Sequence, residues 1–188
     1  MYYRLSSDLQ AVNVRMKKVN NKFFNPIKGE LIDKDKDYLQ ELPFKFKMLV
    51  RTDLDDGSTQ IPTMYHYFSS ARLMHKKLVD VIQTAGVDNI EVFPAIVTWP
   101  EKNKVIEDYV VVNIVGLVSC AVKEESDTSP IADVDYFHSI TIDPARTNNL
   151  LMFRLAESQI EVLVHEQVAD AIKAGNFEGV VLEPVAEI

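Results

Sequence analysis

Short apolar runs separated by turn residues dominate the C-terminal part of the chain. Runs at 151–155 and 160–164 flank a polar segment, which predicts two adjacent strands. Apolar residues then recur at helical spacing over 165–174, and Gly175 follows where a left-handed helix C-cap is expected. A strand over 180–182 completes the pattern. These few elements cannot cover their own apolar faces, so the upstream chain must supply a second layer.

The upstream chain shows the same mixture of strand and helix patterns. Strict alternation over 44–51 predicts a strand with one covered face. An apolar stripe over 69–86 predicts the longest helix, capped by Ser69 or Ser70 and ended by Gly86. Further strands are predicted at 1–5, 90–99, 109–122 and 139–142. The nearly continuous apolar run within 109–122 is typical of a central strand that is covered on both faces.

Together these patterns predict an α+β fold. A mixed, largely antiparallel sheet, or pair of sheets, packs with two main helices at about 69–86 and 165–174. The length of 188 residues suits a single domain over 1–188, with an irregular part at about 1–66 and a more regular part at about 67–188. We find no internal repeat in the sequence.

The charge is distributed unevenly along the chain. Residues 1–50 hold ten Lys and Arg against six Asp and Glu, whereas residues 51–188 hold ten against twenty-two, so the net charge of −8 comes from the second part. An acidic surface repels phosphate, which argues against a nucleic-acid partner and suits a basic protein. A solvated surface that only maintains solubility is the alternative explanation.

The apolar segments are too short and too interrupted to cross a membrane. The longest one, 109–122, contains Asn113 and Ser119 and falls short of the roughly 20 residues that a spanning helix requires. The first residues lack the apolar core of a secretory signal, and Cys120 is the only cysteine. These features predict a cytoplasmic protein without disulfides and without membrane contact.

Catalytic and metal-binding motifs are incomplete. His165-Glu166 resembles the start of a zinc-protease motif, but Ala169 stands where the second histidine is required. Asp133, Asp135 and His138 form the one cluster that could converge on a metal ion or serve as the site of a small enzyme. We expect no metal and no cofactor. A small enzyme with a site at this cluster, or an adaptor subunit, stays as the alternative to the function given below.

Several segments resemble one protein family. They are SSARLMHKKLVDVIQTAGVDNIEVFPAIV, YVVVNIVGLVSCAV, MFRLAESQIEVLVHEQVADAIKAG and FEGVVLEPV, together with the opening MYYRL. The chain is similar over about 66–185 to immunity proteins of bacterial polymorphic-toxin and contact-dependent competition systems. An acidic position that often follows the central strand in that family is Ala121 or Val122 here. The resemblance implies a small α+β protein that binds and neutralises a co-encoded toxin and has no catalytic activity.

The acidic loops are the candidate surface for a toxin with a basic active site. The candidate residues are Glu124, Glu125, Asp127, Asp133 and Asp135 in one loop and Asp53, Asp55 and Asp56 in another, with Arg154 as a further candidate. Arg154 lies in the apolar strand 151–155 and has two interpretations. It either faces solvent or pairs with Glu157 or Glu161, or it anchors an interface.

Overall fold

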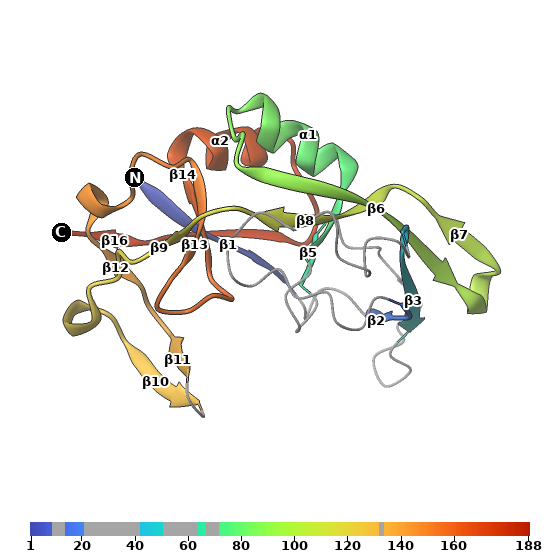
Figure 1. The fold of residues 1–188 in the computed structure, drawn as a ribbon, viewed down its shortest axis with the longest axis horizontal. Coiled ribbons are helices and arrows are strands. Elements are labelled where there is room, and N and C mark those ends of the chain that lie inside the picture. Colours follow the sequence, from blue (N-terminus) through green and yellow to red (C-terminus); the bar gives the residue numbers. More distant parts are fainter. Residues whose placement is uncertain (9–13, 21–41, 51–63, 67–71, 132–133) are drawn as a thin grey trace.

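Two sheets lie under one layer of helices in the computed structural model, which describes residues 1–8, 14–20, 42–50, 64–66, 72–131 and 134–188 (Figure 1). One sheet has five strands in the order β15 (Val180–Pro184), β1 (Tyr2–Ser7), β14 (Val162–His165), β13 (Met152–Leu155) and β9 (Leu117–Val118). The other has seven, in the order β2 (Val14–Lys18), β3 (Phe44–Val50), β6 (Ile90–Trp99), β8 (Tyr109–Ile114), β5 (Arg72–His75) and β4 (Met64–His66), with β7 (Lys104–Ile106) paired to β6. The fold is therefore α+β, as predicted.

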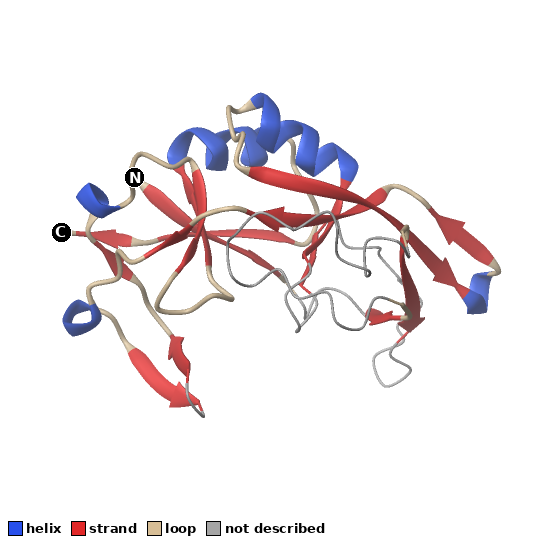
Figure 2. Cartoon of the chain, in the orientation of Figure 1, coloured by secondary structure: helices blue, strands red, loops and turns tan. Residues whose placement is uncertain are grey.

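The remaining elements are small. Helix α1 covers Lys76–Thr84 and α2 covers Glu166–Ala174, and the two pack against each other above the sheets (Figure 2). The other pairs and turns are the hairpin β10 (Thr128–Ile131) with β11 (Val134–Phe137), the parallel pair β12 (Thr141–Ile142) with β16 (Ala186–Glu187), and the 3-10 turns Pro100–Lys102, Lys123–Glu125 and Pro144–Arg146.

One apolar core lies between the helices and both sheets. Its helical members occupy matching positions, namely Leu78, Val79 and Ile82 in α1 and Val168, Ala169 and Ile172 in α2. Strands of both sheets contribute to the same cluster, for example Val112 of β8 and Val164 of β14. There are two further apolar clusters. The one that contains Trp99 is built on the seven-stranded sheet, and the one that contains Phe153 includes residues of the five-stranded sheet. The shared core joins the two sheets.

The two halves repeat one structural unit, contrary to the prediction from sequence. In the first unit, β5 and β6 both pair antiparallel with β8, so the segment β5, α1, β6 is a parallel strand-helix-strand motif with one strand inserted between its two strands. In the second unit, β14 and β15 pair in the same way with β1. The helices of the two units begin 90 positions apart, at Lys76 and Glu166.

Details of the two units agree residue by residue. The imidazole of His75 caps α1 and that of His165 caps α2, each accepting from the backbone N–H two residues later. Opposite each histidine stands a tyrosine that opens the central strand, Tyr109 in β8 and Tyr2 in β1. The ring centroids of these pairs are 5.4 and 5.2 Å apart, respectively. We conclude that the chain contains two copies of one folding unit.

Three local predictions need correction. The first helix begins at Lys76 rather than near Ser69, because 72–75 pairs with β8 as a strand; Ser69 and Ser70 lie outside the described residues. Gly175 has a φ of −74°, so it is not left-handed, and Asn176 with a φ of 47° takes that role.

The predicted strand over 109–122 is also not continuous. It divides at Gly116, whose φ is 139°, into β8 in one sheet and β9 in the other. The first part confirms the prediction of a covered central strand, because all of Tyr109–Ile114 is buried and lies between β6 and β5. The break therefore carries the chain from the first repeated unit to the second.

Candidate partner-binding surface

Residues 123–131 and 134–138 extend away from the two sheets, and we call the segment 123–138 the acidic arm (Figure 1). It starts with the turn Lys123–Glu125 and continues as the hairpin β10 and β11, whose register runs from Thr128 opposite Phe137 to Ile131 opposite Val134. The sequence predicted a loop here. The pairing makes it an ordered projection instead.

The base of the acidic arm is firmly attached to the body. Phe137 is fully buried in the cluster that also contains Phe153. The His138 N–H donates to the carbonyl of Asp127 at 2.8 Å, and the Thr141 hydroxyl donates to the carbonyl of Glu125 at 2.7 Å. A buried aromatic anchor and hydrogen bonds on both sides hold the orientation of the arm.

The acidic candidates of this segment lie in several places. Glu124 and Glu125 are exposed in the turn before the hairpin, and Asp127 is exposed at its start. The backbone of Asp135 pairs with that of Pro130 in the hairpin. The structure does not describe the side chain of Asp135, and Asp133 lies outside the described residues. The second predicted loop, with Asp53, Asp55 and Asp56, also lies outside the described residues.

An exposed aromatic pair lies in the same arm. Tyr136 is 38% exposed, and its ring lies edge-on to that of His138 with centroids 5.2 Å apart. The Nε2 atom of His138 is 3.0 Å from the hydroxyl oxygen of Ser129 on the neighbouring strand. Tyr136 was not among the residues predicted from the sequence. The available signal was a tyrosine within an acidic turn-rich segment, a residue type that is enriched in interfaces.

Arg154 lies in the interior, so the expectation that it faces solvent is wrong. The residue is 1% exposed, and its Nη1 donates to the carbonyl of Gln159 at 3.2 Å. Strand β13 lies between β14 and β9, and all four of its residues are buried. This burial lowers the pKa of the Arg154 guanidinium to about 10. The candidate surface in this structure therefore does not include Arg154.

Cys120 also lies in the interior. It is fully buried, and burial raises the pKa of its thiol to about 12, with the carboxylates of Glu157 and Asp143 acting in the same direction. A protonated, buried thiol is a poor nucleophile. This environment agrees with a packing role.

The described residues form one notable cleft but bring no set of metal-binding side chains together. Within them, no three His, Cys, Asp or Glu side chains gather so that they could hold a metal. A cleft of about 510 Å³ lies off the start of α1, where Pro94, Ile96 and Val110 provide apolar walls and Lys76 and Glu107 provide opposite charges. No helix in the described part of the chain is both long and apolar enough to span a bilayer.

Comparison with known proteins supplies the decisive observation. Residues 2–187 match the model of the immunity protein family Imm11. The chain belongs to the Imm11 family. A comparison with curated proteins finds no match. The matched residues span both copies of the repeated unit and the acidic arm.

Proposed function

We propose that this Imm11 protein binds one bacterial toxin in the cytoplasm and neutralises it by covering its active site, without catalysing a reaction. The observation that carries the proposal is the family match over 2–187. Immunity requires a protein partner, and a rigid α+β scaffold with an ordered projection is suited to occlusion. An active site that acts on nucleic acid or nucleotides is commonly cationic, which suits an acidic inhibitor.

We propose the acidic arm as the toxin contact. Its exposed carboxylates, Glu124, Glu125 and Asp127, would steer a basic partner toward the protein, and Tyr136 would provide an aromatic anchor. Asp133 and Asp135 lie in the same arm by sequence and would add to its negative potential. The burial of Phe137 at the base fixes the arm before binding, which reduces the entropy lost on association.

The test combines protection and binding. The product of a neighbouring reading frame is produced with and without the immunity protein, and cell survival is measured together with association kinetics of the purified pair. In the arm variant, Glu124, Glu125 and Asp127 are each changed to lysine. We expect its association rate constant to fall by about tenfold or more at low salt, because charge steering is reversed.

A charge-matched control separates the arm from net charge. Asp88, Glu101 and Glu178 are exposed acids elsewhere on the chain, and changing them to lysine alters the net charge by the same amount. We expect this control to retain most of the association rate. Equal losses in both variants would contradict the arm as the contact, and survival of cells without the immunity protein would contradict the neutralising function itself.

A further inference from the structure

Both copies of the repeated unit cap their helix with a titratable side chain. The Lys77 N–H donates to Nδ1 of His75 at 3.1 Å, and the Gln167 N–H donates to Nδ1 of His165 at 3.3 Å. An imidazole accepts a hydrogen bond at Nδ1 only when that nitrogen carries no proton. Both caps therefore require the neutral ring with its proton on Nε2, whereas the usual Ser, Thr or Asn cap does not depend on pH in this way.

The surroundings of His75 include charges of both signs. The ring meets Tyr109 edge-on, and the adjacent Lys76 N–H donates to the carbonyl of Asp108 at 2.8 Å. The charged groups that act on the ring are Asp108 from the turn before β8 and Lys76, Lys77 and Asp80 from α1. The pKa of His75 is lowered, with burial as the largest cause; Asp108 opposes this, the two lysines add to it, and Asp80 opposes it.

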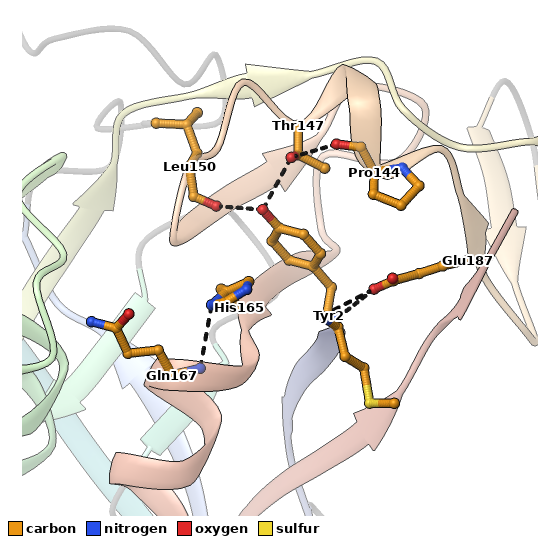
Figure 3. Close-up of polar contacts among 8 residues, drawn as sticks. Tyr2, Pro144, Thr147, Leu150, His165, Gln167 and Glu187 are labelled. Carbon is orange, nitrogen blue, oxygen red and sulfur yellow. Dashed lines mark hydrogen bonds and ion pairs between the residues drawn. The ribbon is translucent and has the colours of Figure 1, made fainter.

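His165 has the equivalent position in the second unit (Figure 3). Its ring lies edge-on to Tyr2, whose hydroxyl oxygen is 3.0 Å from the Thr147 hydroxyl and 3.0 Å from the carbonyl of Leu150. The Glu166 N–H donates to the carbonyl of Met1 at 2.8 Å, as Lys76 does to Asp108 in the first unit. Glu166 is the acidic residue in the first turn of α2, and Glu187 accepts from the Tyr2 N–H and pairs with the amino group of Met1.

We propose that the His75 cap is an acid-sensitive device, in which protonation of its imidazole releases the start of α1 and loosens the helix layer that covers both sheets. A proton on Nδ1 would point at the backbone N–H from which Nδ1 now accepts a hydrogen bond, so the cap would be lost. The imidazolium would also place a positive charge at the positive end of the helix dipole. Since α1 and α2 pack together over one core, loosening of either helix removes a neighbour of the other.

The direction of the pH effect follows from the lowered pKa of His75. The unfolded chain binds a proton near the ordinary pKa of about 6.5, whereas the folded cap binds it only at lower pH. The stabilisation is therefore fully present above about pH 6.5 and is lost as the pH falls through the folded pKa. Each unit by which the folded pKa lies below the ordinary value corresponds to about a tenfold change in the opening equilibrium.

The test uses the full chain and two readouts. Nitrogen-15 NMR of the imidazoles at pH 7.5 is expected to show the Nε2–H tautomer for both cap histidines, since Nδ1 is the acceptor. Hydrogen exchange of the Lys77 and Gln167 amides, corrected for intrinsic rates, is then compared at pH 7.5 and 5.0. We expect protection of the Lys77 amide to fall severalfold at the lower pH.

Asparagine substitutions identify the cause. In the double variant His75→Asn and His165→Asn, the cap accepts a hydrogen bond at every pH, so protection is expected to change little between the two pH values. The control His138→Asn alters an exposed histidine that caps no helix and should retain the wild-type response. An Nδ1–H tautomer in the wild type, or a double variant with the full wild-type pH response, would overturn the proposal. The tautomer readout applies even if the double variant does not fold.

Discussion

At the scale of single residues, one carboxylate acts on two arginines from different sheets. Arg4 on β1 donates to the two oxygens of Glu161 at 2.6 and 2.5 Å. Arg72 on β5 donates to the carbonyl of the adjacent Ile160, which connects the first sheet to the second. Burial and the neighbouring Arg154 lower the pKa of Arg72, and the Glu161 carboxylate acts against both. The charge of Glu161 is therefore needed where the two repeated units meet.

We expect Glu161→Gln to lower the free energy of unfolding by about 3 kcal/mol, because Arg4 loses its close ion pair and the buried Arg72 loses the carboxylate that favours its charge. The matched control is Glu183→Gln, since Glu183 is 58% exposed and lies 3.9 Å from the same Arg4. An exposed pair of this kind contributes at most about 1 kcal/mol. Urea unfolding at pH 7 gives both values. Similar losses in the two variants would show that burial does not determine the strength of the Arg4 contacts.

The burial of these arginines could not be predicted from the sequence. Arginine is seldom buried, and alternation within an apolar strand predicts that Arg154 points to solvent. These side chains are covered by residues that are distant in sequence. Arg72, for example, donates a hydrogen bond to the carbonyl of Ile160, which is 88 positions away. The inert position of Cys120, by contrast, was predictable, because its surroundings within 109–122 are apolar.

At the scale of elements, the repeat explains the different residues that end the two helices. Gly86 follows α1 with a φ of 101°, and Asn176 stands at the equivalent position after α2 with a φ of 47°. Glycine adopts positive φ without a steric cost, and asparagine is the next most tolerant residue. The glycine rule predicted the first position correctly. It selected Gly175 in the second unit, one residue before the position that is left-handed.

We expect Gly86→Ala to cost about 1–2 kcal/mol of stability, because an L side chain is strained at this φ and a Cβ would lie 3.2 Å from Leu151 Cδ1. Asn176→Gly should change stability by less than about 1 kcal/mol, since glycine accepts the same conformation. Thermal or urea unfolding of both variants measures the difference. A larger loss from Asn176→Gly than from Gly86→Ala would mean that the two positions are not equivalent.

Most strands could be predicted from local patterns, whereas the start of α1 and the repeat could not. Residues 72–75 continue the apolar stripe of the helix, and only pairing with β8 makes them a strand. The repeat left a faint signal, in which His75, Asp80, Ile82 and Pro94 recur 90 positions later as His165, Asp170, Ile172 and Pro184. Most other positions changed, although the pattern of burial over 72–84 is the same as that over 162–174, so comparison of residue identities alone was insufficient.

At the scale of the whole molecule, we propose that the chain is one cooperative domain. Ile82 of α1 and Ile172 of α2 are each 1% exposed in the core that both sheets share. Trp99, the sole tryptophan, lies in a different cluster within the first unit. If the shared core couples the units, destabilisation of the second unit must also destabilise the surroundings of Trp99 in the first. Independent units would unfold separately.

Ile172→Ala tests this coupling. Truncation of a buried isoleucine is expected to cost about 3 kcal/mol through lost burial and the resulting cavity. We expect the unfolding transition reported by Trp99 fluorescence to shift as far as the transition reported by far-ultraviolet circular dichroism, because one core supports both units. Ile160→Ala is the control, since Ile160 is 54% exposed and its truncation should change stability by less than about 0.5 kcal/mol. A circular dichroism transition that moves while the Trp99 transition stays in place would show that the two repeated units fold as separate bodies.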